Sequence, residues 1–329
     1  MGNSICCFNQ EDGVEEDVAF LQGRIRPVSV DEIQLVDSGA DSTVARPLQA
    51  ICLGVIGTGR SSFVNTLLNS STECKVSGGQ LRGTRGCRLV SNRASNDLGG
   101  DQFFLDYIDC EGLRSDQKVK SVELDDFFHT LVPSIRSFKG GTVSHILFTL
   151  DVAERQTAPT MNNLLVLADV FKAFRSNCYL VLTKWDTNGV QKDWNNTLLA
   201  WCKKNRRVKT VESLVGEPPR PETMLVEYLE YLDNKVDSAV DAEAGRKMKT
   251  LLAFFENRLI WAYNLGTAQH EDREDGELPV FQEQMYLFYR KEALSSLMQN
   301  ATWKKTNTLP LLRPHADLTV LADEYIMKN

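Results

Sequence analysis

The distribution of apolar and polar positions predicts an alternation of short strands and helices over most of the chain. Apolar runs of strand length lie at about 48–55, 103–108, 143–150, 179–182 and 258–263. We also expect a short strand near Leu89. Apolar residues at helical spacing predict helices at about 60–68, 122–135, 164–174, 190–205, 222–236, 242–255 and 281–298. Runs that are apolar throughout are typical of parallel strands buried on both faces. The pattern therefore predicts an α/β fold with a mostly parallel central sheet.

The two ends of the chain lack this alternation. Residues 1–47 are polar and rich in turn-forming residues, and we expect them to form a flexible tether. Residues 301–329 have a mixed composition, with apolar side chains that can dock on the domain or on a partner. The chain has 329 residues, so a single enlarged domain over 48–300 fits the length.

A glycine-rich segment joins the first predicted strand to the first predicted helix. Residues 54–62 read GVIGTGRSS. Strand, glycine-rich turn and helix form a phosphate-binding loop, because backbone N–H groups turn inward and the helix N-terminus adds its positive dipole end. The segment departs from the pattern G-x-x-x-x-G-K-[ST] at Arg60, which stands in place of the lysine.

A second motif follows the strand predicted at 103–108. Residues 109–112 read DCEG, which is the pattern D-x-x-G. Its position places the carboxylate of Asp109 at the C-terminal edge of the sheet. From there Asp109 can hold a magnesium ion through water, and the N–H of Gly112 can contact a γ-phosphate.

The loop at 77–87 lies between these two motifs. A threonine in this loop can reach a phosphate-bound magnesium ion. Thr84 is the best candidate for this role, ahead of Ser77 and Ser91. A plain surface loop is the alternative.

A third motif directly follows the strand at 179–182, where residues 183–186 read TKWD. In the pattern [NT]-K-x-D the aspartate, here Asp186, accepts hydrogen bonds from guanine N1–H and the exocyclic amine. The stem of Lys184 covers the base and ribose. Adenine lacks both donors and would leave Asp186 unpaired, so the motif favours guanine. Asn264, after the last predicted strand, is a candidate to close over the base from the opposite side.

Composition excludes several other classes. A formal net charge of −7 without a long basic run argues against a nucleic-acid partner. We expect neither a transmembrane helix nor a secretory signal. The eight cysteines form no C-x-x-C pair and the four histidines are scattered. This pattern argues against a zinc site or a disulfide framework and favours reduced thiols in a cytosolic setting. Cys52 and Cys178 are expected to be small buried apolar residues.

The N-terminus reads MGNSICC. Once Met1 is removed, Gly2 is an N-terminal glycine, which predicts myristoylation of Gly2 and palmitoylation of Cys6, Cys7 or both. Cys6 stands where the myristoylation pattern usually has Ser or Thr. One myristoyl chain binds membranes only marginally, so a second acyl chain matters for stable anchoring. We therefore expect a cytoplasmic protein held peripherally on a membrane, with a chance Gly2 in a plain tail as the alternative.

With the three motifs and Thr84 in this order, the chain resembles the immune-associated nucleotide-binding GTPases, a family related to septins and to plant avirulence-induced proteins. Specific similarities are GTRGC at 83–87, Leu113 after DCEG, and LDVAERQT at 150–157. The resemblance covers about 49–297. It implies a P-loop NTPase G domain over 48–300, a mostly parallel sheet flanked by helices, with a helical insertion at about 207–257 and a C-terminal helix.

The resemblance also implies roles for individual residues. Mg²⁺ would be coordinated by Ser61 and Thr84, with Asp109 holding it through water. Arg60, Thr84 and Gly112 would serve hydrolysis. GTP or GDP would be the ligand, and dimers or oligomers would form through the G domain. The nucleotide-binding residues would be Gly54, Gly57, Thr58, Gly59, Arg60, Ser61, Ser62, Asp109, Gly112, Thr183, Lys184, Asp186 and Asn264.

Two departures from the family pattern concern hydrolysis. The planar guanidinium of Arg60 can clasp phosphate differently from lysine or displace the nucleotide. DCEG replaces the usual DTPG, and Leu113 after it supplies no glutamine to orient water. We therefore expect a slow GTPase that acts as a membrane-associated switch. A nucleotide-binding scaffold without hydrolysis is the main alternative. An ATP-using P-loop kinase or ATPase is another, but it leaves TKWD unexplained.

Overall fold

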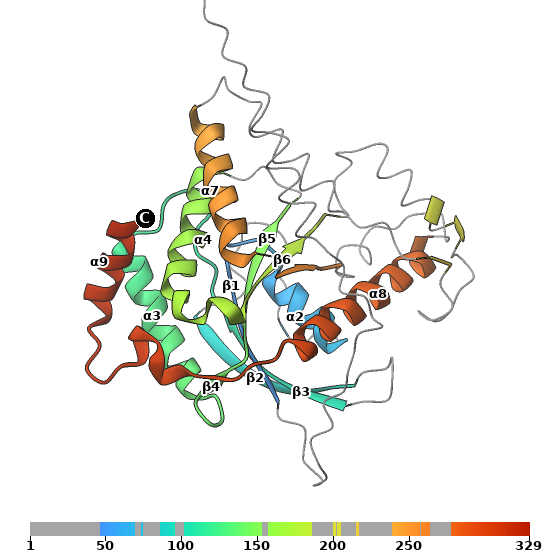
Figure 1. Ribbon diagram of the computed structural model, residues 1–329, viewed down its shortest axis with the longest axis horizontal. Helices are drawn as coiled ribbons and strands as arrows, with labels where there is room; N and C mark the ends of the chain where they lie inside the picture. Colours follow the sequence, from blue (N-terminus) through green and yellow to red (C-terminus); the bar gives the residue numbers. More distant parts are fainter. Residues whose placement is uncertain are drawn as a thin grey trace, which may run out of the picture.

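The structure is a computed structural model, and six of the strands that it describes form a central sheet between two layers of helices (Figure 1). The residues that it describes are 47–69, 74, 86–95, 102–152, 157–185, 200–201, 203–204, 215–216, 239–256, 258–263 and 278–329. In spatial order, the strands described in this sheet are β2 (Cys87–Ser95), β3 (Gln102–Cys110), β1 (Leu48–Gly54), β5 (His145–Asp151), β6 (Cys178–Thr183) and β7 (Leu259–Trp261). Strand β2 is antiparallel to β3, and all the other pairs are parallel. The predicted α/β fold with a mostly parallel sheet is confirmed.

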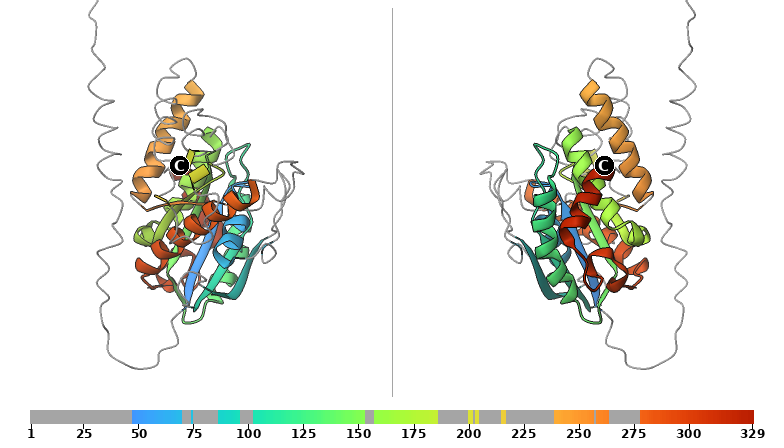
Figure 2. Two further views of the ribbon diagram at one scale, coloured as in Figure 1. Left: turned by 90° about the vertical axis from the view of Figure 1, so that its right-hand side faces the viewer. Right: turned by 90° about the vertical axis from the view of Figure 1, so that its left-hand side faces the viewer.

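The helices divide between the two faces of the sheet (Figures 1 and 2). One face carries α2 (Arg60–Leu68) and α8 (Leu278–Gln299), and the other carries α3 (Ser121–Arg136), α4 (Ala158–Val170), α7 (Ala239–Phe255) and α9 (Leu318–Lys328). Crossovers between parallel strands are right-handed, so the direction of travel along the sheet decides the face. The chain moves one way from β1 to β3 past α2. It moves the other way from β3 to β5, β6 and β7, past α3, α4 and α7.

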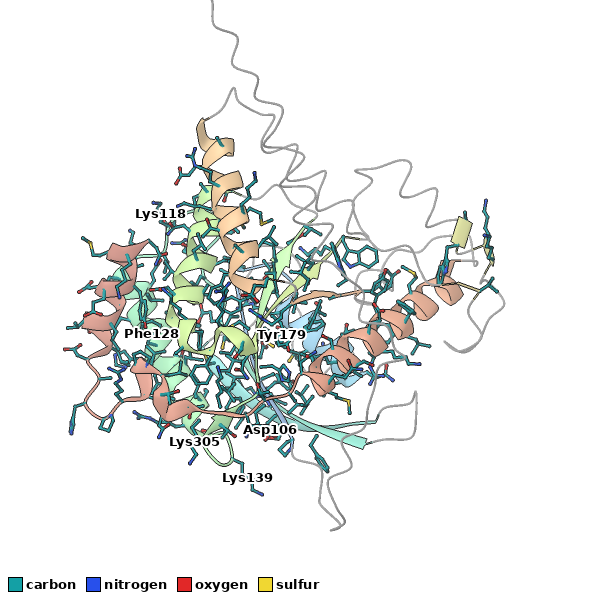
Figure 3. All side chains as sticks on the ribbon, in the orientation of Figure 1. Asp106, Lys118, Phe128, Lys139, Tyr179 and Lys305 are labelled. Carbon is teal, nitrogen blue, oxygen red and sulfur yellow. The ribbon has the colours of Figure 1, made fainter. Side chains whose placement is uncertain are left out.

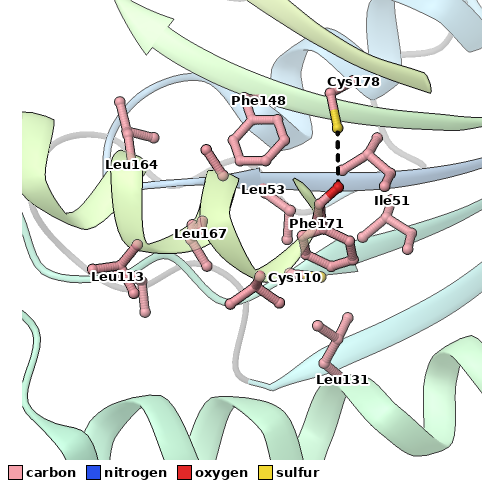
Figure 4. Close-up of a cluster of buried hydrophobic side chains, with 14 of the residues drawn as sticks. Ile51, Leu53, Cys110, Leu113, Leu131, Phe148, Leu164, Leu167, Phe171 and Cys178 are labelled. Carbon is pink, nitrogen blue, oxygen red and sulfur yellow. Dashed lines mark hydrogen bonds between the residues drawn. The ribbon is translucent and has the colours of Figure 1, made fainter. Parts of the chain in front are cut away.

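The core consists of two apolar layers because alternate residues of each strand face opposite sides. In β1, Ile51 and Leu53 pack among the residues of α3 and α4, as Figure 4 shows, whereas Cys52 packs among those of α2 and α8. Cys52 and Cys178 are both buried, as predicted. Burial raises the pKa of the Cys178 thiol to about 12, which keeps it protonated.

Helix α4 begins earlier than the apolar pattern predicts, at Ala158 rather than near 164. The N-cap is Thr157, whose hydroxyl accepts a hydrogen bond from the N–H of Thr160. The first turns contain polar residues that are buried through tertiary contacts. Asn163 donates to the carbonyl of Arg114 at 2.6 Å and accepts from the N–H of Val119 at 2.8 Å. Periodicity cannot reveal such partners, so the predicted start was wrong.

The C-terminal segment docks on the domain, which was one of the two alternatives left open. Strand β8 (Lys304–Lys305) pairs with β4 (Thr142–Val143), and the 3₁₀ segments η5 (Thr306–Thr308) and η6 (Pro310–Leu312) follow. Helix α9 then packs against α3 and α4. The side chains of Leu309 and Leu311 belong to the main core. Lys139 and Lys305 mark this end of the molecule, and Lys118 lies toward the opposite end, where α3 begins (Figure 3).

The range predicted for a helical insertion, about 207–257, contains α7. This helix packs on α4, and Met248, Leu251 and Phe255 lie in the main core. Helix α7 is therefore part of the helical layer on this face of the sheet, and the insertion itself stays a prediction. Residues 207–214 and 217–238 lie outside the described residues.

The helix predicted at 222–236 and most of the helix predicted at 190–205 also fall outside the described residues. None of the helices in the described segments combines the length and apolar character that crossing a membrane requires.

Candidate functional site

The carboxyl ends of β1, β3, β5 and β6 meet at one edge of the sheet. The pairing register places Gly54 beside Thr149 and Asp151 beside Thr183. The chain leaves β1 toward β3 on one face and leaves β3 toward β5 on the other, so this edge is a topological switch point. In open α/β sheets, ligands bind at the carboxyl edge at such a point.

The glycine-rich segment forms the loop between β1 and α2. Gly57 and Gly59 have φ angles of 86° and 81°, and Gly59 is the N-cap of α2. The loop lies close to β5: a Cβ on Gly54 would lie 2.4 Å from Oγ1 of Thr149. A side chain at this position would push the loop away from the sheet. The predicted order of strand, glycine-rich turn and helix is confirmed.

Thr58 anchors the loop from inside. Its hydroxyl is buried, donates to the carbonyl of Val55 at 2.9 Å, and lies 2.7 Å from the hydroxyl of Thr149. The side chain therefore points into the fold, and the prediction that Thr58 binds nucleotide stays a prediction. The half-buried Ser62 follows in the first turn of α2.

Ser61 and Asp109 bring the first two motifs together. The hydroxyl of Ser61 donates to Oδ2 of Asp109 at 3.1 Å, and Oδ1 lies 3.4 Å away. Asp109 is buried, with an exposed fraction of 5%. A hydroxyl and a carboxylate at this spacing supply the hard oxygen atoms that Mg²⁺ prefers.

Arg60 does not point along the loop. Its Nη1 donates to the carbonyl of Cys110 at 2.7 Å, which joins the first turn of α2 to the end of β3. Burial lowers the pKa of the guanidinium, and the nearby carboxylate of Asp109 opposes this shift. Arginine stays charged because its ordinary pKa is far above neutral pH. A large cation therefore lies between the phosphate loop and the D-x-x-G motif.

Gly112 packs tightly against this cation. A Cβ at Gly112 would lie 2.5 Å from Nη2 of Arg60 and 2.7 Å from the backbone N of Ile56. The next residue, Leu113, extends the pairing with β1: its N–H donates to Gly54 at 3.1 Å, and its carbonyl accepts from Ile56 at 2.8 Å. Only glycine fits at position 112 without displacing the loop.

The third motif is hydrogen-bonded to the first. The hydroxyl of Thr183 lies 2.7 Å from the carbonyl of Thr58 and 3.2 Å from that of Leu150. Thr183 is fully buried at the end of β6. The hydroxyl thus fixes the distance between the glycine-rich loop and the TKWD motif.

Lys184 has a positive φ of 57° and is one-third exposed. Its Nζ lies 2.5 Å from Oδ2 of Asp151, the last residue of β5. The ion pair holds the lysine stem across the edge of the sheet between β5 and β6.

The next residue, Trp185, is buried and donates from Nε1 to the carbonyl of Ala262 at 3.0 Å. Its ring packs edge-on against Trp261 and Tyr289. Aromatic packing therefore secures the motif up to the residue before Asp186.

The remaining predicted site residues lie outside the described residues. They are Thr84, Asp186 and Asn264, together with the acylation candidates Gly2, Cys6 and Cys7. The weaker alternative Ser91 lies in β2, whereas Ser77 is also outside.

The contacts at the site that were not predicted include the ion pair to Asp151, the contact of Thr149 with Thr58, and the contact of Arg60 with the Cys110 carbonyl. Asp151 had a usable signal, because a carboxylate at the carboxyl end of a parallel strand lies at the ligand-binding edge. The other two contacts depend on strand register and side-chain direction, which the sequence pattern does not show.

No protein-family model matches the sequence, and neither does any curated protein. Among solved structures, the chain is similar to Toc33 from Arabidopsis thaliana as a dimerization-deficient mutant, with 15% identity over 76% of this chain and 86% of that chain and a TM-score of 0.38.

Two further Toc33 crystal structures are similar. One is a complex with GDP and Mg²⁺, with 17% identity over 79% of this chain and 88% of that chain and a TM-score of 0.39. The other is a complex with Mg²⁺ and GMPPNP, with 18% identity over 78% of this chain and 87% of that chain and a TM-score of 0.42.

The class of fold is defined by the chain itself. A mostly parallel sheet in the order β2-β3-β1-β5-β6-β7, with one antiparallel edge strand and a glycine-rich loop between β1 and α2, is a P-loop α/β fold of the G-domain type. The particular family, immune-associated nucleotide-binding GTPases, stays a prediction.

Proposed function

We propose that this protein binds GTP and GDP with Mg²⁺, hydrolyses GTP slowly and acts as a switch. One observation carries the proposal: two hydrogen bonds, Ser61 to Asp109 and Thr183 to Thr58, unite all three sequence motifs at the carboxyl edge of the sheet. Through these bonds the three motifs lie against one another, as a shared nucleotide site requires.

The phosphate groups would lie at the N-terminus of α2. The backbone N–H groups of its first turn and the loop before it attract anions. Ser61 and Asp109 fit Mg²⁺ through their oxygen atoms, and Thr84 is the further predicted ligand. When bound, Mg²⁺ neutralises charge on the phosphates. The N–H of Gly112 would face the γ-phosphate, beside the guanidinium of Arg60.

The base would lie over Lys184, which the ion pair with Asp151 orients. Asp186 would then accept the two guanine hydrogen bonds, since Trp185 anchors the residue just before it. An adenine nucleotide would leave that carboxylate unpaired, which is strongly unfavourable at a buried site.

Calorimetric titration with GTP, GDP and ATP, each with Mg²⁺ and with a chelator, tests this proposal. We expect binding of both guanine nucleotides that weakens when the metal is removed, and little binding of ATP. Asp186→Asn should lose the guanine preference, whereas Asp116→Asn, at an exposed aspartate, should keep it. The absence of any nucleotide binding would refute the proposal, and equal binding of ATP would favour an ATP-using enzyme.

A scaffold without hydrolysis is the second candidate, and the contact of Arg60 with the Cys110 carbonyl favours it. Arg60 is engaged with the protein rather than extended along the loop. In addition, Leu113 is buried and offers no group that orients water. Single-turnover GTP hydrolysis by Arg60→Lys beside wild type separates the two. If Arg60→Lys hydrolyses GTP much faster than wild type, the native protein is a scaffold. If wild type hydrolyses GTP slowly and the variant does not hydrolyse it, the native protein is a GTPase.

The membrane part of the proposal depends on the N-terminal sequence. We propose acylation at Gly2 with Cys6 or Cys7, which would hold a cytoplasmic protein on a membrane. Gly2→Ala should move the protein from the membrane to the soluble fraction of cells. An unchanged distribution would contradict the acylation. Self-association through the G domain is proposed from the family resemblance, and sedimentation with GDP and with a GTP analogue measures it.

A further inference from the structure

Two cysteines face each other at the end of the β2–β3 ladder. Cys87 begins β2 and Cys110 ends β3, and the register pairs them directly. The neighbouring pair is hydrogen-bonded, since the N–H of Glu111 donates to the carbonyl of Gly86 at 2.6 Å. Hydrogen-bonded and non-hydrogen-bonded pairs alternate in antiparallel ladders, so Cys87 and Cys110 form a non-hydrogen-bonded pair with Cα atoms about 4.5 Å apart. A disulfide accepts Cα separations of about 4.4–6.8 Å.

The two side chains lie on the same face of the ladder, because directly opposed residues of antiparallel strands point to the same side. Thr130 on α3 donates to the sulfur of Cys87 at 3.5 Å. Cys110 is completely buried, as its place in the core of Figure 4 shows, whereas Cys87 is half-buried. A small reagent can therefore reach Cys87, and Cys110 is in place to react with it next.

The pair lies beside two groups of predicted site residues. Glu111 and Gly112 directly follow Cys110, whose carbonyl accepts the hydrogen bond from Arg60. Thr84, which lies outside the described residues, comes three positions before Cys87 in the sequence. A covalent bond between the two sulfurs would tie the start of the segment that contains Gly112 to the start of β2.

We propose that Cys87 and Cys110 form a reversible disulfide, with a low-molecular-weight disulfide such as glutathione disulfide as the oxidant. Cys87 loses its proton to water, and its thiolate attacks one sulfur of glutathione disulfide. One glutathione leaves as a thiolate and takes up a proton. Cys110 then loses its proton and attacks the sulfur of Cys87, which releases the second glutathione. The two cysteines lose two electrons, and one disulfide is reduced to two thiols.

The consequence for the switch rests on the proposed function. The segment that follows Cys110, which contains Gly112, would rearrange with the γ-phosphate, as switch loops do. The disulfide ties the start of this segment to the start of β2, so it restricts that rearrangement. Release of bound nucleotide therefore slows in the oxidised protein and recovers after reduction.

Peptide mapping tests the disulfide itself. The full-length protein is equilibrated in glutathione buffers of increasing oxidised fraction, alkylated and digested without reductant. We expect a linked pair of peptides that contain Cys87 and Cys110. Cys110→Ser should stop at a mixed disulfide on Cys87, and Cys87→Ser should not react at Cys110. The control Cys178→Ala, at another buried cysteine, should keep the link. Glutathione retained on Cys87 in the wild type, or no reaction there, would overturn the proposal.

Release of a fluorescent GDP analogue tests the consequence. We expect release at least several-fold slower after oxidation, restored by dithiothreitol and unaffected by oxidation in Cys87→Ser. Equal rates in the oxidised and reduced protein would overturn the regulatory role. A disulfide that forms in a protein that binds no guanine nucleotide refutes the proposed function alone. Nucleotide binding without the Cys87–Cys110 link refutes this inference alone.

Discussion

Replacing Thr183 with valine tests whether one hydroxyl holds the phosphate loop in place. The side chain is fully buried, and its oxygen lies 2.7 Å from the carbonyl of Thr58 and 3.2 Å from that of Leu150. Valine keeps the β-branched shape that suits a strand. It puts a methyl group where the hydroxyl donates, so the variant removes the hydrogen bond with little other change.

The expected magnitude follows from burial and distance. A buried carbonyl that loses its hydrogen bond costs about 1–3 kcal/mol. A methyl group 2.7 Å from the oxygen of Thr58 also lies inside the carbon contact distance of about 3.5 Å, so the loop must shift. We expect a loss of about 2 kcal/mol in the free energy of unfolding, or about 4–8 °C in Tm for a domain of this size. If the shifted loop weakens the binding free energy of GDP by about 1.4 kcal/mol, the affinity for GDP drops about tenfold.

The assay compares wild type, Thr183→Val and Thr183→Ser by urea unfolding and by titration with GDP. Tryptophan fluorescence follows both, since the buried Trp185 lies two residues away. Thr183→Ser keeps the hydroxyl and should stay within about 1 kcal/mol of wild type. The reasoning is refuted if the valine variant matches wild type in both measurements. It is also refuted if Thr183→Ser and Thr183→Val lose the same free energy of unfolding and the same GDP affinity. The lost hydroxyl would then not be the cause, because the serine variant keeps it.

Two further predictions concern buried polar groups. Burial lowers the pKa of His145 to about 4, so the free energy of unfolding has its full value above pH 6.5 and falls by about 3 kcal/mol as the pH drops to 4. His145→Phe should flatten this part of the urea-unfolding profile relative to wild type, and parallel profiles would contradict the assignment. Arg290 is buried and donates to Thr66 at 3.0 Å and to Leu67 at 3.2 Å, at the C-terminus of α2. Arg290→Met should therefore lose about 3 kcal/mol by thermal unfolding. The control Arg313→Met, at an exposed arginine, should lose little free energy of unfolding. Equal losses in the two variants would show that the hydrogen bonds of Arg290 do not stabilise the fold.

The sheet was predictable because short stretches of sequence are enough to identify its strands. Buried parallel strands need apolar residues on both faces, so β1, β5 and β6 appear as continuous apolar runs. Helix boundaries were less predictable, as α4 shows. Its first turns carry Asn163, which is buried only because the chain at 114–119 supplies its hydrogen bonds.

At the candidate site, too, some contacts were predictable from the sequence and others were not. Ser61 and Asp109 were predicted to act together, and they are hydrogen-bonded. Arg60 was flagged as the unusual residue, but its sequence position did not reveal that it would turn to the Cys110 carbonyl. The direction of a long side chain depends on what surrounds it, and those neighbours come from β3.

By itself, the sequence determined the order of strands and helices and the placement of three motifs at strand ends. These properties depend on residues a few positions apart, which a periodic pattern reports. Tertiary structure decided the rest: the partner of Arg60, the pairing of Cys87 with Cys110, the ion pair of Lys184 and the docking of the C-terminal segment. Each joins residues far apart in the chain, and only strand register and helix packing bring such residues within a few ångströms.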